Sequence, residues 1–193
     1  MTGLTTSTPI GAVALEPLDL ARHLDLLHAW VTHPRSAFWQ MQGATVDDVR
    51  TEYAAIEADP HHAALIGTVD GVPAFLVEHY DPAHSDLAGH LVNADGYVGM
   101  HVLVAPPADD AAPVRGYTDA VFAAVMADLF TDPDVTRVVV EPDVRNDAIR
   151  AKNVAAGFVE LHPIELPSKT AMLSTCSREA FAASRLGGAH VVR

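Results

Sequence analysis

The sequence Glu-Pro-Asp-Val-Arg-Asn at residues 141–146 directly follows an apolar run at residues 138–140. Pro142 has no N–H group to donate, so a strand that reaches this point cannot continue as a regular ladder. The carboxylate of Asp143 is therefore expected at the mouth of a strand. An earlier apolar segment contains His101, two residues after a glycine. A histidine inside one strand and a carboxylate at the end of a neighbouring strand are the parts of an acid/base pair.

Helices are predicted on both sides of this stretch. Apolar residues at helical spacing predict a helix over residues 20–31 that stops before Pro34. A second helix, capped by Thr45, runs to residue 58, and a third runs from near residue 116 to residue 129. Asn146 or Asp147 caps a fourth helix, which Gly157 ends in a left-handed conformation. A short helix is expected over residues 178–185.

The strands separate these helices. Residues 64–69 and 74–77 flank Asp70-Gly71, a strong hairpin signal. Further strands are expected at residues 97–104, 136–141, 158–161 and 170–175. Residues 1–9 are expected to be disordered and residues 186–193 to be a loose tail. Residues 10–185 are therefore predicted to form one α/β domain with a mixed, splayed central sheet flanked by helices.

Charge limits the classes of partner. The net charge is −13, from 12 Lys+Arg against 25 Asp+Glu. Nucleic acids and anionic membrane surfaces both require a basic footprint, so neither is expected as a partner. A cationic small molecule suits the balance, although solubility explains the bulk of the charge. Oligomeric state cannot be inferred from these residues.

Cysteine and histidine usage argues against several other chemistries. Cys176, the single cysteine, lies in an apolar run and is expected to be a buried strand residue rather than a nucleophile. The first ten residues have no Lys or Arg, and no apolar stretch approaches the ~20 residues of a membrane span. A cytoplasmic protein is expected.

The histidines do not indicate a metal site. Adjacent residues on a strand point to opposite faces, so His61 and His62 cannot chelate together, and no metal is expected.

The segment Pro-Val-Arg-Gly-Tyr-Thr at residues 113–118 lies between a predicted strand and a predicted helix. A glycine allows close approach of the backbone, and a helix N-terminus presents free N–H groups, so the combination suits a phosphate. Alone, it is also an ordinary helix start. The order of elements around it resembles the GNAT acyl-CoA transferase superfamily over nearly all of residues 10–180. In the pyrophosphate loop Gly116 is kept, whereas Pro113 and Thr118 depart from the Gln/Arg and Gly/Ala that the superfamily has there.

Several short motifs occur along the chain in this order: His33-Pro34, Phe38-Trp39, Tyr80-Asp81-Pro82, Gly99-Met100-His101, Arg115-Gly116-Tyr117, the stretch at 141–146, Ala156-Gly157-Phe158 and Leu166-Pro167-x-Lys169. Together they resemble the siderophore hydroxamate acyltransferases, meaning the aerobactin- and mycobactin-type hydroxylysine acyltransferases and their desferrioxamine-type relatives. The resemblance implies transfer of an acyl group from acyl-CoA to an N-hydroxylated lysine or diamine, with His101 and Asp143 as the catalytic pair.

The resemblance also implies roles around that pair. Trp39 and Gln40 belong to a segment that covers the acceptor in this family, although Trp39 could equally be a core aromatic. Asp143 either orients the imidazole or binds or deprotonates the amine. Asn146 either contacts the pantetheine arm or caps the fourth helix. Backbone N–H groups near residues 102–104 stabilise the oxyanion. The expected donor-binding residues are Val102, Leu103, Val104, Arg115, Gly116, Tyr117, Thr118 and Asn146.

Other functions remain open at this level. The acidic balance also suits an aminoglycoside or polyamine N-acetyltransferase, because those acceptors are cationic as well. The altered loop leaves room for a non-catalytic acyl-CoA- or siderophore-binding module, although His101 and Asp143 together count against it. Taken singly, His101 is also compatible with a satisfied core histidine and Asp143 with an ordinary turn residue.

Overall fold

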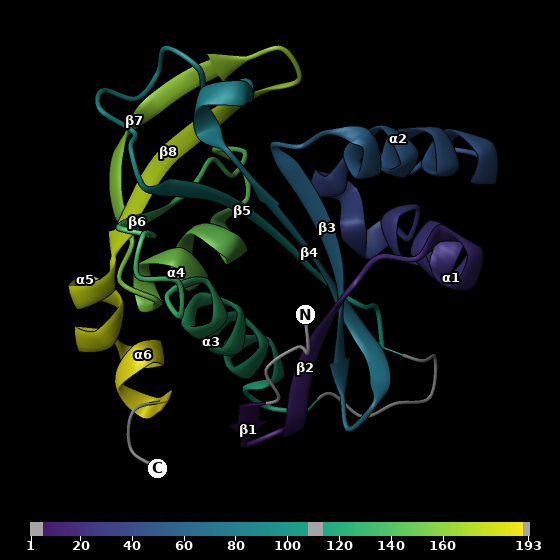
Figure 1. Cartoon of the computed structure of the whole chain (residues 1–193), viewed down its shortest axis with the longest axis horizontal. Helices are drawn as coiled ribbons and strands as arrows, with labels where there is room; N and C mark the ends of the chain where they lie inside the picture. The colour runs from purple at the N-terminus through teal and green to yellow at the C-terminus, as the bar shows by residue number, and fades with distance from the viewer. Residues whose placement is uncertain (1–5, 108–113, 191–193) are drawn as a thin grey trace. The chain divides into compact units, whose positions relative to one another are not determined.

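The computed structural model describes residues 6–107 and 114–190. Within these residues, eight strands form the sheet, in the order β1-β2-β3-β4-β5-β6-β8-β7 (Figure 1). Both parallel and antiparallel pairs occur, and helices flank the sheet, so the predicted α/β class with a mixed, splayed sheet is confirmed. The strands are β1 (Thr6–Thr8), β2 (Gly11–Pro17), β3 (His62–Val69), β4 (Val72–Tyr80), β5 (Tyr97–Val104), β6 (Arg137–Val140), β7 (Val159–Leu166) and β8 (Lys169–Ser177).

The helices match most of the sequence expectations. Thr45 caps α2 through a reciprocal capping box with Asp48, and Asn146 rather than Asp147 caps α4. Gly157 follows α4 with φ +92°, the left-handed conformation that was predicted. The helices are α1 (Leu20–Val31), η1 (Pro34–Trp39), α2 (Val46–Ala58), η2 (Pro82–His84), α3 (Tyr117–Leu129), α4 (Asp147–Ala155), α5 (Arg178–Ala183) and α6 (Arg185–His190).

The chain divides into two compact units, which we describe separately. Unit 1 comprises residues 1–78 and 102–117. Its core joins the apolar faces of α1 and α2 to β3 and β4, because residues spaced three and four apart on each helix share one face. The Asp70-Gly71 turn has φ of +51° and +78°, so both residues adopt the left-handed conformation that two-residue hairpins favour. The buried core residues are Leu27, Trp30, Val31, Val49, Tyr53, Ile56, Ile66 and Leu76.

Unit 2 comprises residues 79–101 and 118–193. Here β6 lies between β5, its parallel neighbour, and β8, its antiparallel neighbour, and β8 forms a hairpin with β7. Phe122 of α3 meets Phe158 edge-on with ring centroids 6.4 Å apart. Cys176 of β8 is fully buried, so the expectation of a buried strand cysteine is confirmed, and burial raises the pKa of its thiol to about 12.

Pairing between β5 and β6 is short, and this creates the splay. The paired residues run only from Tyr97 opposite Arg137 to Gly99 opposite Val139. Beyond Val140, Pro142 interrupts β6, and Asp143 makes a single isolated bridge to Ala171. The chain therefore places residues 141–143 at a strand mouth, as the missing N–H of the proline requires.

Three sequence expectations need correction. Residues 6–8, expected to be disordered, form β1 against β2, and β2 itself was not foreseen. β7 extends to Leu166 instead of ending near residue 161, because it pairs along almost the whole of β8. The tail expected from residue 186 onward is helical as far as His190. Pro113 and the other residues of 1–5, 108–113 and 191–193 lie outside the described structure.

Gly157 supplies a test of this fold. A Cβ at Gly157 would lie 2.5 Å from the carbonyl oxygen of Ala180, whereas a Cβ at Gly71 would meet nothing within 4 Å. Both glycines have positive φ, so Gly71→Ala is a matched control for the backbone cost alone. We expect Gly157→Ala to lower the free energy of unfolding by about 1–3 kcal/mol more than Gly71→Ala, as measured by urea titration. Equal losses in the two variants would contradict the close approach of α5.

Candidate active site

Glu141 lies at the centre of a polar cluster in unit 2. Nε2 of His101 lies 2.5 Å from Oε1 of Glu141, and the hydroxyl of Tyr80 donates to Oε2 at 2.6 Å. Nζ of Lys169 lies 3.6 Å from Oε1. Glu141 is 5% exposed, and its partners come from β4, β5 and β8. The structure therefore buries one carboxylate under a histidine, a phenol and an ammonium group.

Strand register explains why His101 and Glu141 meet. Gly99 and Val139 form the last pair between β5 and β6, and His101 and Glu141 lie two residues further along each chain. Side chains two residues apart on a strand share a face, so the two groups point the same way. A Cβ at Gly99 would lie 2.1 Å from the ring of Tyr80, so the glycine makes room for that ring beside His101.

Electrostatics favour a charged carboxylate at position 141. Burial alone would raise the pKa of Glu141, but His101, Lys169 and the Tyr80 hydroxyl outweigh burial and lower the pKa to about 2. Glu141 therefore accepts the proton on Nε2 of His101, which leaves Nδ1 as the basic nitrogen of the neutral imidazole. The His101 side chain is 35% exposed, so the ring is accessible to a small molecule.

Asp143, the expected partner of His101, has a different principal contact. Its carboxylate accepts from Nε and Nη2 of Arg145 at 2.9 and 2.6 Å and from the Arg145 backbone N–H at 2.8 Å. The side-chain and backbone hydrogen bonds from Arg145 hold the pKa of Asp143 at about 2. The structure thus brings His101 together with Glu141, and it brings Asp143 together with Arg145.

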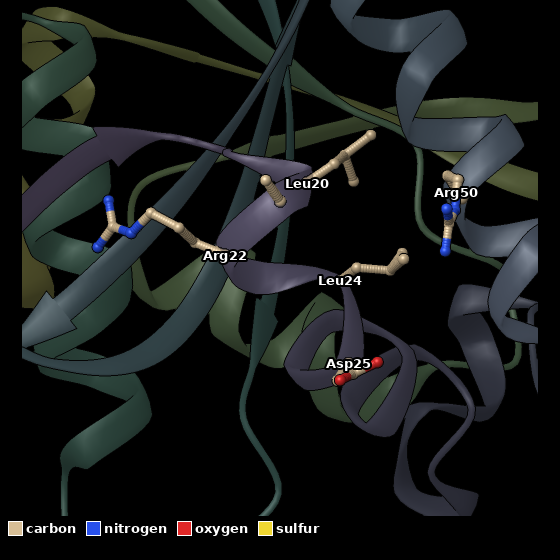
Figure 2. Close-up of a pocket in the computed structure, with 6 residues that line it drawn as sticks. Leu20, Arg22, Leu24, Asp25 and Arg50 are labelled. Carbon is tan, nitrogen blue, oxygen red and sulfur yellow. The ribbon is translucent and has the colours of Figure 1, made fainter.

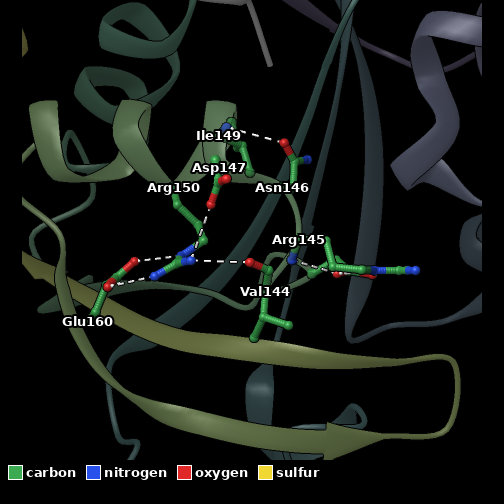
Figure 3. Close-up of polar contacts among 8 residues, drawn as sticks. Val144, Arg145, Asn146, Asp147, Ile149, Arg150 and Glu160 are labelled. Carbon is green, nitrogen blue, oxygen red and sulfur yellow. Dashed lines mark hydrogen bonds and ion pairs between the residues drawn. The ribbon is translucent and has the colours of Figure 1, made fainter.

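The stretch at 141–146 is fixed at its far end by α4 (Figure 3). The side-chain oxygen of Asn146 accepts from the N–H of Ile149 at 3.3 Å, so Asn146 fills the capping role. Arg150 reaches back to the carbonyl oxygen of Val144 at 3.1 Å and binds Glu160 on β7 with two hydrogen bonds. These contacts hold the turn that carries Asp143 and Arg145 in place.

The described part of the expected phosphate loop begins at residue 114. Gly116 has φ +80°, and a Cβ there would meet nothing within 4 Å, so the backbone has open space beside it. α3 begins at Tyr117, and Arg115 and Thr118 are exposed. The arrangement can hold an anionic group at the start of α3. Val102, Leu103 and Val104 are half-buried in the second half of β5.

Trp39 closes η1 in unit 1 and has a defined anchor. Its indole N–H donates to the hydroxyl of Tyr53 at 3.0 Å, and that hydroxyl donates to Oε1 of Glu78 at 2.9 Å. Trp39 also packs partly buried against the core of unit 1, and Gln40 follows it, exposed and in a left-handed conformation with φ +63°. The hydrogen bond fixes the orientation of the Trp39 ring, and packing against the core fixes its position.

Unit 1 also contains a cavity of about 410 Å³ beside the start of α1 (Figure 2). Leu20, Leu24 and Asp25 come from α1, and Arg50 from α2 faces them. Ala21 and Arg22 complete the lining. Two guanidinium groups against one carboxylate favour an anion over a cationic amine, so this cavity does not match the expected acceptor.

Sequence reasoning missed three residues of the cluster. In the sequence, Glu141 is marked only as the residue before Pro142, and Tyr80 and Lys169 only as parts of the motifs Tyr80-Asp81-Pro82 and Leu166-Pro167-x-Lys169. Strand parity does not separate Glu141 from Asp143, because side chains two residues apart share a face. The register does, since Glu141 lies two residues beyond Val139 just as His101 lies two residues beyond Gly99.

A family model described as Acetyltransferase (GNAT) domain matches residues 19–166. Three curated proteins are similar. SAT14 of Stachybotrys chartarum, named as a proposed O-acetyltransferase, is 30% identical over 88% of this chain and 36% of its own length. Hydroxyornithine transacylase SID3 of Ajellomyces capsulatus is 28% identical over 87% of this chain and 38% of its own length. N-hydroxyputrescine acetyltransferase of Acinetobacter baumannii is 27% identical over 87% of this chain and 79% of its own length. The chain therefore spans well under half the length of the first two.

Solved structures share the fold. An uncharacterized Bacillus halodurans protein superposes with a TM-score of 0.88 at 21% identity, covering 98% of this chain and 96% of that chain. The aminoglycoside acetyltransferase AAC(6')-Ib, in complex with ribostamycin and coenzyme A, superposes with a TM-score of 0.77 at 22% identity over 90% and 97% of the two chains.

Among the described helices, none is long and apolar enough to cross a membrane.

The contact between Asp143 and Arg145 predicts a pH-dependent stability. The folded pKa of about 2 lies below the ordinary aspartate value of ~3.9, so ionised Asp143 stabilises the fold above about pH 4, and this contribution disappears as the pH falls through about 2. We expect Asp143→Asn to lower the urea midpoint at pH 7 and the difference from wild type to shrink between about pH 4 and pH 2.

Asp47 provides the matched control. It is 90% exposed and only loosely paired with Arg50, at 3.8 Å. Asp47→Asn should change the midpoint little at any pH. A difference for Asp143→Asn that is constant from pH 7 to pH 2 would show that the charge of Asp143 does not stabilise the fold.

Proposed function

The chain belongs to the GNAT acetyltransferase family, and from that premise we propose that it transfers an acyl group from acyl-coenzyme A to the hydroxylated nitrogen of an N-hydroxylated diamine or amino acid, forming a hydroxamate. The observation that carries the proposal is the kind of acceptor in the relatives' names. SID3 is named for hydroxyornithine and the Acinetobacter protein for N-hydroxyputrescine, and each aligns with 87% of this chain. Hydroxamates of this kind are siderophore components.

The His101–Glu141 contact supplies the acid/base chemistry for this reaction. The acceptor nitrogen attacks the carbonyl carbon of the thioester, and its proton passes to the imidazole of His101. The C–S bond then breaks, and the coenzyme A thiolate leaves. Ionised Glu141, 2.5 Å from Nε2, stabilises the imidazolium that forms and fixes the orientation of the ring.

An N-hydroxylated nitrogen is less basic than an alkylamine, so it reaches the site with its lone pair available. Little deprotonation is needed before attack, and much of the rate enhancement can come from placing the nitrogen against the thioester. Because little proton removal is required, a single histidine such as His101, whose side chain is 35% exposed, can serve as the base. The net charge of −13 favours an acceptor that carries a further cationic group.

Asp143 takes a different role in this proposal. A carboxylate with a pKa of about 2 is a weak base at neutral pH, so Asp143 is better suited to binding than to proton abstraction. Its fork with Arg145 orients a guanidinium group whose side chain is 77% exposed. We assign Asp143 to positioning Arg145 at the strand mouth.

Donor binding is assigned to the segments that the sequence singled out. Backbone N–H groups of Val102, Leu103 and Val104 are proposed to stabilise the oxyanion. Arg115, Gly116, Tyr117 and Thr118, at the start of α3, are proposed to hold the pyrophosphate of coenzyme A. Asn146 keeps an amide N–H₂ group for the pantetheine arm while its oxygen caps α4. Trp39 and Gln40 are proposed to cover the acceptor.

The experiment that tests the function follows thiol release from acetyl-CoA and succinyl-CoA. N-hydroxycadaverine, N-hydroxyputrescine and N-hydroxyornithine are compared with cadaverine and kanamycin. We expect release with at least one hydroxylated acceptor and at least tenfold lower kcat/KM with cadaverine. Preference for kanamycin or cadaverine would replace the proposal with an aminoglycoside or polyamine N-acetyltransferase. Coenzyme A binding without release for any acceptor would indicate a binding module.

Variants assign the residues. We expect His101→Ala to lower kcat by a factor of ~100 or more and Glu141→Gln by a factor of ~10–100, because the first removes the base and the second its anionic partner. Asp143→Ala should act mainly through the acceptor KM, with a loss of about tenfold in kcat/KM. A loss in kcat for Asp143→Ala as large as that for His101→Ala would instead make Asp143 a catalytic residue.

A further inference from the structure

We propose that Lys169 is a positioning residue that sets the proton affinity of His101: by sharing the Glu141 carboxylate with the imidazole, it makes the ring release its proton at a lower pH. The proposal rests on the proposed function in that a neutral imidazole is the base of the reaction. Its geometric content, however, can be measured on the resting protein.

The position of Lys169 is fixed by the β7–β8 hairpin. Lys169 is the first residue of β8 and pairs with Leu166, so only two residues separate it from the end of β7. Its side chain is 16% exposed, and Nζ lies 3.6 Å from Oε1 of Glu141. The same oxygen lies 2.5 Å from Nε2 of His101. The imidazole of His101 and the ammonium group of Lys169 therefore meet at one carboxylate oxygen.

The other charged groups of unit 2 near this oxygen do not duplicate Lys169. Tyr80 of β4 donates its hydroxyl to Oε2, and a phenol supplies no positive charge there. Arg145 forms two parallel hydrogen bonds with Asp143, so its charge is largely matched there. Lys169 lowers the pKa of both Glu141 and Asp143, which places its ammonium group within electrostatic reach of both carboxylates.

The sign of the effect follows from Coulomb's law. Ionised Glu141 stabilises the imidazolium form of His101, and a second cation on the same oxygen opposes that stabilisation. Removal of the Lys169 charge would leave Glu141 matched by His101 alone, so the ring would keep its proton to a higher pH. The two nitrogens lie at most about 6 Å apart, because they are 2.5 and 3.6 Å from the same oxygen. With an effective dielectric constant of about 20, the shift is then on the order of two pH units.

The first arm of the test measures kcat/KM against pH for wild type, Lys169→Met and Lys169→Arg. We expect the acidic limb for Lys169→Met to move to higher pH by roughly one unit or more, with the plateau within about threefold of wild type. Lys169→Arg keeps the charge and should keep the wild-type limb. An equal loss at every pH would mean that Lys169 acts only on structure, and an unmoved limb would refute the proposal.

The second arm does not depend on turnover. The imidazole of His101 is titrated by ¹H–¹⁵N NMR in histidine-labelled protein, and its signal among the 11 histidines is assigned with His101→Gln. We expect the midpoint of the titration to rise in Lys169→Met and to stay near wild type in Lys169→Arg. An unchanged midpoint in Lys169→Met would overturn the proposal.

The two arms separate the two possible failures. A protein that transfers no acyl group but shows the NMR shift would refute the proposed function and keep the role of Lys169. Normal turnover without the NMR shift would support the proposed function and refute the role of Lys169. Lys169→Gln, a second neutral variant, replaces Lys169→Met if circular dichroism shows that the latter does not fold, and the same outcomes apply to it.

Discussion

The site in unit 2 depends on the burial of one carboxylate. Glu141 is 5% exposed, and an ionised carboxylate at that depth is stable only when charged and hydrogen-bonded partners surround it. His101, Tyr80 and Lys169 supply those partners from three strands. Because each of them meets Glu141, the carboxylate ties together the end of β4, the middle of β5 and the start of β8.

The splay of the sheet makes this burial possible. A regular parallel pair would have continued past Gly99 and Val139, and its ladder would have occupied the space between the strands. Pro142 prevents that continuation, and the missing side chain at Gly99 admits the Tyr80 ring. Two local features of the sequence, one proline and one glycine, thus open the space that the polar cluster fills.

Much of this fold could be predicted from the sequence because its signals are local. Helical spacing gave the bounds of α1, Thr45 marked the cap of α2, and Asp70-Gly71 marked the β3–β4 turn. β1 and the length of β7 were missed although each strand pairs with the next one across a two-residue turn, because neither turn carries the Asn-Gly or Asp-Gly signal that marks the β3–β4 hairpin. The site follows the same division. His101 and the strand mouth were predictable, whereas the choice of Glu141 over Asp143 depended on the register between two strands.

The burial of Cys176 has a practical consequence. The chain has one cysteine, and its thiol is fully buried with its pKa raised to about 12, so the folded protein presents almost no thiolate to solvent. Disulfide reagents that report free coenzyme A can therefore be present throughout turnover without consuming the protein. Conversely, the rate at which such a reagent labels Cys176 would report the rate at which β8 opens. This one sulfur atom can therefore serve as a probe of unfolding in unit 2.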